Sequence, residues 1–195
     1  MNLINALAIS IGALAAVATY LCLGTSFGLQ VWALFIGWGS FYHTGGETAG
    51  LTKSAINHVW GVVVAAITLF IVGTVGGSVL VTSIIVGVSV VVLVLGAHLP
   101  ALATIPAAVY GYASTAAFVL LTGVALGDLG ALVKAAGIVL ISLVIGNIFG
   151  LVSQKIAGGM AKSAWEGRAR RSAIFRRATF QAILPAAMMP AEISA

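Results

Sequence analysis

The sequence predicts an all-α membrane protein with about six transmembrane helices, arranged as two inverted three-helix repeats. The first observation is composition: of 195 residues, 61% are hydrophobic and only 7% are charged. An ordinary soluble domain has about 25% charged residues, and a fold of this size cannot hide so much apolar surface from water. The second observation is a series of six apolar runs that carry almost no charge, and the third is a short motif that occurs twice.

The same composition excludes several other classes of protein. Disordered chains are poor in hydrophobic residues and rich in charge. The 24 glycines follow no Gly-X-Y period, which excludes collagen. A single cysteine excludes both a disulfide framework and a cysteine-based zinc site.

The apolar runs have the length that a helix needs to cross a hydrocarbon core of ~30 Å, about 17–25 residues. They cover residues 3–23, 27–42, 59–75, 78–97, 99–121 and 132–152. Residues 84–95 are apolar on every side, which favours helices over a β-barrel, whose strands alternate apolar and polar residues. The first run is expected to stay in the protein as a helix, because residues 1–2 lack the positive charge of a signal peptide.

The basic residues predict the orientation, because positive charge stays on the cytoplasmic side. The C-terminus is therefore expected inside, and six crossings place the N-terminus inside as well. We expect a transmembrane domain over residues 1–153 and a basic cytoplasmic tail over residues 154–195. Capping-box spacing from Ser163 to Glu166 predicts a short helix in that tail. Anionic lipid headgroups, rather than nucleic acid, are the expected partners of the tail's five arginines: Arg168, Arg170, Arg171, Arg176 and Arg177.

The repeated motif relates the two halves of the transmembrane domain. Residues 35–40 and 109–114 both read hydrophobic, bulky, Gly, aromatic, small, Ser, at an offset of 74 residues. The same offset carries the first run onto the fourth and the third onto the sixth, which predicts repeats over about 1–76 and 77–153. Three crossings per repeat give the copies opposite orientations, and such proteins bind substrate at the repeat interface. The alternative is that small residues simply recur in Gly- and Ala-rich helices.

The second and fifth runs are expected to be short or broken helices. Residues 29–42 would form only ~21 Å of helix. The fifth run contains Pro100, Pro106 and Gly111, and proline removes a backbone donor. Matched interrupted segments indicate a binding site, although a short run can also thin the bilayer and a proline can merely shape packing.

Apart from Lys134 at the start of the sixth run, no run contains a carboxylate, Lys or Arg, which argues against a proton-coupled transporter and against an enzyme. We therefore expect no catalytic residue, no metal and no cofactor. His43, His58 and His98 are placed near the cytoplasmic interface, where histidine is common. Asn147 is expected to bridge helices.

Rings and hydroxyls in the second and fifth runs can line a path for a small neutral solute. Trp and Tyr also anchor proteins at the membrane interface, which is the alternative for these rings. The expected path residues are Phe35, Gly37, Trp38, Ser40, Tyr42, Tyr110, Gly111, Tyr112 and Ser114.

Two segments carry a family resemblance, residues 32–42 with Gly45-Gly46, and residues 105–111. They resemble the YcdZ-like family of small inner-membrane proteins of bacteria, a domain of unknown function, over about residues 1–152. The resemblance implies a multi-pass protein of the bacterial inner membrane and supplies no substrate. Residues 99–106 also loosely resemble the Leu-Pro-Thr-Pro signature of urea transporters, which hints at neutral solutes.

The sequence thus favours a channel or facilitator for a small, uncharged solute, with its path between the second and fifth helices. A homo-oligomer is expected. The alternative is a structural or accessory subunit that packs its Gly/Ala faces against a larger membrane complex.

Overall fold

A computed structural model describes the chain over residues 2–183, with side chains as far as Lys162. In this range the fold is all-helical, with no strand, as predicted. The helices are α1 (Leu3–Leu23), α2 (Val31–His43), α3 (Glu47–Val75), α4 (Val79–Leu95), α5 (Ile105–Thr122) and α6 (Leu129–Ile183), with two 3₁₀ turns, η1 (Gly96–His98) and η2 (Pro100–Leu102), before α5. Five of these segments are long and apolar enough to cross a membrane: Leu3–Leu23, Glu47–Val75, Val79–His98, Ile105–Thr122 and Leu129–Lys162.

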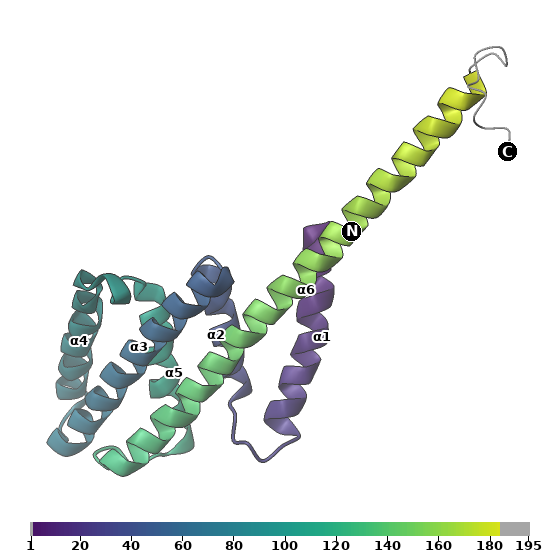
Figure 1. The fold of residues 1–195 in the computed structure, drawn as a ribbon. Helices are drawn as coiled ribbons and strands as arrows, with labels where there is room; N and C mark the ends of the chain where they lie inside the picture. The colour runs from purple at the N-terminus through teal and green to yellow at the C-terminus, as the bar shows by residue number, and fades with distance from the viewer. Residues whose placement is uncertain (1, 184–195) are drawn as a thin grey trace.

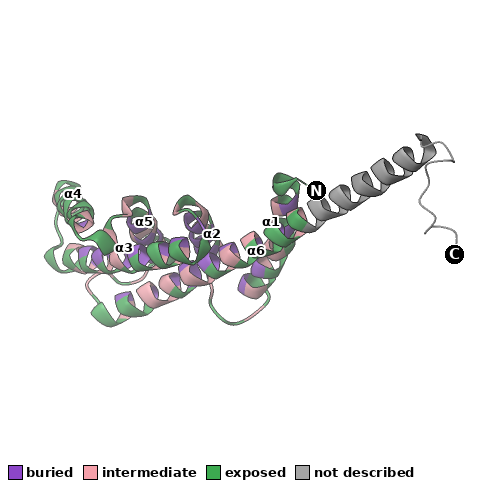
Figure 2. Cartoon of the chain, turned by 45° about the horizontal axis from the view of Figure 1, so that its top comes forward, coloured by how far each residue is buried: buried purple, intermediate pink, exposed green. Residues whose placement is uncertain are grey.

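Two long helices, α3 and α6, organise the bundle. The α6 helix packs against α1, α2, α3 and α5, whereas α3 packs against α4, α5 and α6. Successive helices run in opposite directions, because the connections alternate between the two ends of the bundle (Figure 1). As a result α1 runs opposite to α4, α2 opposite to α5, and α3 opposite to α6. Seen from above, α3 and α6 form one layer and α4, α5, α2 and α1 line up along the other (Figure 2).

Side-chain caps and glycines fix several helix ends. The Asn2 side chain accepts a hydrogen bond from the Asn5 backbone N–H at 2.8 Å, which caps α1. The α5 helix ends at Gly123, whose φ of 68° is the left-handed conformation that glycine tolerates best. The α2–α3 turn is held on α6, because the Glu47 backbone N–H donates to Gln154 Oε1 at 2.9 Å.

The second helix is short, as predicted, but the fifth is not broken. The α2 helix has 13 residues, about 20 Å at 1.5 Å per residue. Pro100 lies in η2, and Pro106 lies in the first turn of α5, where proline sacrifices no intrahelical hydrogen bond. The expectation that these prolines interrupt a membrane helix is therefore wrong, and α5 runs regularly from Ile105 to Thr122.

The third and sixth helices extend beyond the predicted runs. The α3 helix begins at Glu47, so its first three turns carry Glu47 and Lys53 before the apolar part. The α6 helix continues from the membrane segment to Ile183. No helix begins at Ser163, because no proline lies between Leu129 and Ile183 to end the preceding one.

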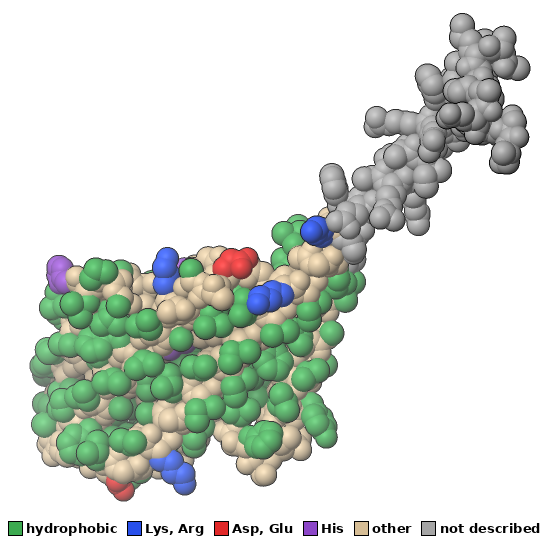
Figure 3. All heavy atoms as spheres, viewed as in Figure 1, with side chains coloured by type: hydrophobic (Ala, Val, Ile, Leu, Met, Phe, Trp, Pro, Cys, Tyr) green, Lys and Arg blue, Asp and Glu red, His purple; other side chains and the backbone are tan. Residues whose placement is uncertain are grey.

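The outer surface is that of a membrane protein. Hydrophobic side chains cover the visible side of the bundle, while Lys, Asp and Glu side chains gather at its two ends (Figure 3). Many large apolar side chains are exposed, among them Val79 at 83% and Leu121 at 84%. A surface of this kind is stable against acyl chains and not against water, so the fold is that of a multi-pass membrane protein.

Candidate functional site between the two halves

Four glycines set the contacts between the central helices. A Cβ built at Gly61 of α3 would lie 2.7 Å from the Tyr112 backbone nitrogen of α5, besides overlapping the Ala108 carbonyl oxygen. A Cβ at Gly146 of α6 would lie 2.9 Å from the Trp38 backbone nitrogen of α2. Glycine is therefore required for the backbones of both helix pairs, α3–α5 and α2–α6, to approach this closely.

The other side of each crossing repeats the arrangement. A Cβ at Gly37 of α2 would lie 2.8 Å from the Leu143 carbonyl carbon of α6. A Cβ at Gly111 of α5 would lie 3.0 Å from the His58 Cα of α3. Each pair of helices thus has a glycine on both partners, and Gly37 and Gly111 are the matched glycines of the repeated motif.

A buried polar network lies where these helices meet. His58 of α3 is fully buried, and its Nε2 lies 3.0 Å from Ser40 Oγ of α2. Ser40 Oγ also lies 2.6 Å from Ser54 Oγ, which is 3.4 Å from the same imidazole nitrogen. On the other side of the ring, Asn147 Nδ2 of α6 lies 3.2 Å from His58 Nδ1. The network therefore joins α2, α3 and α6.

The hydrogen-bond pattern defines the state of His58. Asn147 Nδ2 is also 3.2 Å from the Leu143 carbonyl oxygen, which can only accept a hydrogen bond. The amide nitrogen of Asn147, rather than its oxygen, must therefore face both Leu143 and His58. The amide then donates to His58 Nδ1, which must carry a lone pair. The ring is consequently the neutral tautomer with its proton on Nε2, directed at Ser40.

Two polar atoms at this interface lack a partner among the described residues. Asn147 Oδ1 and Ser114 Oγ are both buried and make no hydrogen bond there. Buried acceptors and hydroxyls are nearly always paired, so an unpaired one indicates a place that a water or a small polar molecule can satisfy.

A recess opens between α2 and α5 beside this network. It has a volume of about 420 Å³ and is lined by Ile36, Gly39, Ser40, His43 and Tyr110. His43 Nδ1 and the Tyr110 hydroxyl are 2.9 Å apart, a hydrogen bond that crosses from α2 to α5. Gly39 is exposed, and nothing lies within 4 Å of a Cβ built there. Because Ser40 lines the recess and also contacts His58, it belongs both to the recess and to the buried network.

The two aromatic residues of the repeated motif lie elsewhere. Trp38 is only 3% exposed, packs with Phe149 at a centroid distance of 5.6 Å, and donates its Nε1–H to Ser153 Oγ at 3.1 Å. Tyr112 packs against Val64 on the far side of α5, and its hydroxyl lies 2.9 Å from Ser89 Oγ of α4. The expectation that both rings line one path between α2 and α5 is therefore not what the geometry shows.

The other expected path residues lie in several different places. Ser40 and Tyr110 line the recess, and Gly37 and Gly111 lie at the helix crossings. Phe35 is 41% exposed on the outer surface, and Tyr42 points at Ser153, 2.7 Å away. The side chains of the five arginines expected to meet lipid headgroups, from Arg168 to Arg177, lie outside the described residues.

Sequence reasoning placed His58 at the membrane interface and missed its central position. The polar residues between the second and third apolar runs, 43–58, were expected to form a loop. From Glu47 onward they instead form the first turns of α3. The available signal was the spacing of Ser54 and His58, four residues apart and thus on one helix face. The prediction that Asn147 bridges helices is confirmed by its contact with His58. In the described part of the chain, no three His, Cys, Asp or Glu side chains gather as a metal site would need.

Comparison with known proteins gives a family and no function. No curated protein and no solved structure matches the chain. A family profile described as a protein of unknown function, DUF1097, matches residues 8–158 and carries no YcdZ-like name. The match covers all six helices except the start of α1 and the extension of α6, and the chain therefore belongs to the DUF1097 family.

Proposed function

We propose that this protein is a channel or facilitator for a small, uncharged solute in the bacterial inner membrane. The observation that carries the proposal is the dual position of Ser40, which lines the α2–α5 recess and contacts His58 inside the bundle. Hydrogen-bonding groups thus lead from an open recess to the unpaired Asn147 Oδ1.

The glycine contacts support an inverted repeat as the scaffold of this path. Gly37 corresponds to Gly111 at an offset of 74 residues, and Gly61 corresponds to Gly146 at an offset of 85. Their partners follow the same rule, since Leu34 and Trp38 correspond to Ala108 and Tyr112, and His58 corresponds to Leu143. The offset is 74 residues between α2 and α5 and 85 residues between α3 and α6. The single offset of 74 expected from the motif therefore does not apply to the whole repeat.

The chemistry of the lining favours a neutral solute. The recess and the network contain hydroxyl, amide and imidazole groups and, among their lining residues, no carboxylate or primary amine. An ion would lose its hydration there without a compensating charge. Amides and polyols exchange hydrogen bonds with such groups at no electrostatic penalty, so urea, formamide and glycerol are the appropriate test solutes.

The charge distribution supports cytoplasmic termini. Lys53 lies near the start of α3, and Lys155 and Lys162 lie in later turns of α6, at the end of the bundle from which α1 starts (Figure 1). Lys134 lies at the opposite end, with Asp128. By the positive-inside rule, the lysine-rich end faces the cytoplasm.

Solute permeability of proteoliposomes tests the proposal, with Gly39→Leu as the blocking variant. A leucine at position 39 meets open space at Cβ and extends into the recess, and Gly12→Leu on exposed α1 is the matched control. We expect the native protein and Gly12→Leu to accelerate shrinkage or reswelling for at least one solute, and Gly39→Leu to lose that acceleration.

Two results would overturn the proposal. Native protein that leaves every permeability at the level of empty vesicles would exclude a channel for these solutes. Gly39→Leu that transports as well as the native protein would remove the path from the recess. Purification in mild detergent separates the alternative, since a stoichiometric partner would favour the accessory subunit and a self-contained homo-oligomer the channel.

A further inference from the structure

A second cavity lies between α3 and α4, away from the α2–α5 recess. Its volume is about 360 Å³, within the range of small-molecule sites. The side chains that matter for its chemistry are Trp60, Val64 and Thr68 of α3 with Ile84, Val88 and Ser89 of α4.

The cavity corresponds to a filled position in the other half of the bundle. At the offsets found above, Val64 corresponds to Phe149 and Tyr112 to Trp38. Phe149 and Trp38 pack ring against ring between α1, α2 and α6. On the side of the bundle formed by α3, α4 and α5, the smaller Val64 packs near Tyr112, and space remains between α3 and α4. The substitution of valine for phenylalanine thus accounts for a cavity on one side only.

The polar groups of the cavity are already paired. Trp60 Nε1 donates to the Leu93 carbonyl oxygen at 3.0 Å, Thr68 Oγ1 to the Val64 carbonyl oxygen at 2.7 Å, and Ser89 Oγ to the Val86 carbonyl oxygen at 2.8 Å. With no free donor directed inward, an occupant gains by apolar contact alone. Only 6% of the α4 segment is buried within the bundle, so this helix is open to acyl chains of the bilayer.

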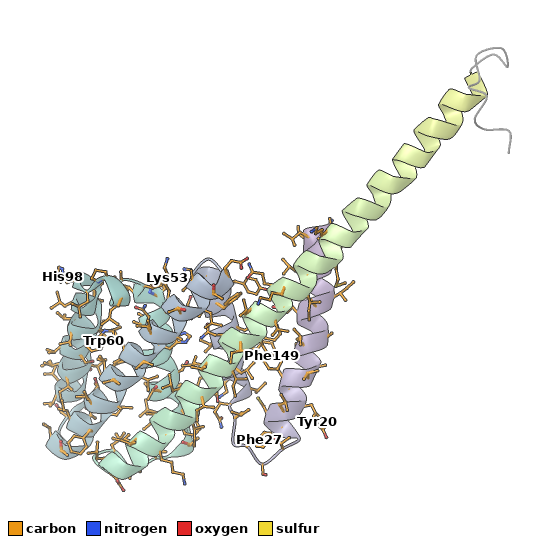
Figure 4. The ribbon with its side chains drawn as sticks, in the orientation of Figure 1. Tyr20, Phe27, Lys53, Trp60, His98 and Phe149 are labelled. Carbon is orange, nitrogen blue, oxygen red and sulfur yellow. The ribbon has the colours of Figure 1, made fainter. Side chains whose placement is uncertain are left out.

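A lysine lies on the same face of α3 as the cavity. Lys53 precedes Trp60 by seven residues and Val64 by eleven, which are helical spacings of one face. At 1.5 Å per residue Val64 lies ~16 Å below Lys53, about half of the ~30 Å hydrocarbon core. Figure 4 shows Lys53 and His98 at the end of the bundle above Trp60. A headgroup near Lys53 therefore places its acyl chain at the depth of the cavity.

We propose that the α3–α4 cavity binds an acyl chain of an anionic phospholipid whose headgroup phosphate contacts Lys53. The positive charge of Lys53 matches the anionic headgroup of such a lipid. The dry apolar cavity, about half of the hydrocarbon core deeper, matches its acyl chain. A smaller recess of about 270 Å³ lies on the other side of Trp60, against Ile56 and Leu102, and offers a place for the second acyl chain. This site does not depend on the transport proposal.

Retained lipid tests the acyl-chain part. Protein purified in mild detergent is washed with lipid-free detergent, and bound phospholipid per chain is measured by native mass spectrometry. We expect one tightly held phospholipid on the native protein and its loss in Val64→Phe, which restores the residue of the other half. Val133→Phe, at a 60% exposed position of α6, is the matched control and should keep the lipid.

Val88→Phe provides the second variant, because Val88 is 60% exposed and lines the cavity from α4, so it does not disturb the packing around Val64. Loss of the lipid in a monodisperse Val64→Phe or Val88→Phe protein supports the site. Native protein without a retained lipid, or both variants retaining it, overturns the proposal. Dimers cross-linked through α4 in the washed native protein would assign the cavity to a second copy instead.

Lys53→Gln tests the headgroup part. In vesicles of mixed phosphatidylglycerol and phosphatidylethanolamine, the native protein should retain the anionic lipid in excess of its share. We expect Lys53→Gln to lose that preference while still retaining a lipid, and Lys155→Gln, a lysine of α6 at the same end, to keep it. An unchanged preference in Lys53→Gln would contradict the assignment of the phosphate to this lysine.

Discussion

Gly146 of α6 lies against the backbone of Trp38 of α2, so that a Cβ at position 146 would come within 2.9 Å of the Trp38 nitrogen. Gly61 of α3 stands in the same relation to Tyr112 of α5, at 2.7 Å. Two helix pairs, each joining one helix of the first half of the chain to one of the second, therefore make the same kind of contact. In lipid, where apolar burial does not drive association, backbone proximity of this kind is a main source of helix–helix attraction.

Alanine at either crossing is expected to destabilise the fold. Gly61→Ala and Gly146→Ala force a methyl group into backbone that no rotamer change can move, and overpacking of this kind costs about 1–3 kcal/mol. Thermal melting in detergent should show a fall of several degrees for both variants. Gly137→Ala on α6, where a Cβ meets nothing within 4 Å, should melt at or slightly above the native temperature. Equal melting temperatures for all three variants would refute the close crossing.

The contact of His58 with Asn147 predicts a measurable coupling between them. A double-mutant cycle with His58→Ala and Asn147→Ala should give a coupling free energy of about 0.6 kcal/mol, and no more than about 1.7 kcal/mol, the range of measured hydrogen bonds within membrane proteins. Ser153 lies in the separate Trp38 cluster, so Ser153→Ala and His58→Ala should be additive within about 0.5 kcal/mol. Coupling that is equal in the two cycles would show that His58 acts through general packing.

The class of fold could be predicted from the sequence because the hydrocarbon core imposes length and apolarity on each crossing helix. The position of His58 was missed, because polar residues at the start of α3 resemble a loop when charge alone is used to mark the membrane boundary. The prolines were misread for a related reason. Pro106 is compatible with a helix if it falls in the first turn, and only the structure fixes where α5 begins.

The sequence predicts that the third run corresponds to the sixth, but not the offset of 85 residues between their glycines. Lipid-facing and core-facing positions in these helices accept any apolar residue, so little identity survives between them. The positions that cannot vary are the glycines at the crossings, and these recur at 85 residues rather than at the 74 of the motif. Contacts of the backbone, rather than residue types, support the proposed relation between these two helices.

Cysteine labelling is expected to place both ends of the chain in the cytoplasm. In a Cys22→Ala background, which removes the single native cysteine, Thr48→Cys and Lys162→Cys should react with an impermeant maleimide only after lysis. Asp128→Cys, exposed at the opposite end, should react on cells whose outer membrane alone has been permeabilised. The reverse pattern would invert the orientation and place the Lys53 end outside.

Trp38→Phe separates a packing role from a path-lining role for this ring. The variant keeps an aromatic ring beside Phe149 but loses the hydrogen bond to Ser153 and the volume of the second ring. We expect it to lose more than the ~0.6 kcal/mol of a hydrogen bond, because the smaller ring leaves part of a buried site empty. Tyr42→Phe, which loses only its contact with Ser153, should lose about 0.6 kcal/mol, and Tyr20→Phe at a 70% exposed position should not change stability. Solute permeability should remain native in Trp38→Phe, because the ring faces α1 and α6 and not the recess. A permeability as low as that of Gly39→Leu would instead return Trp38 to the solute path.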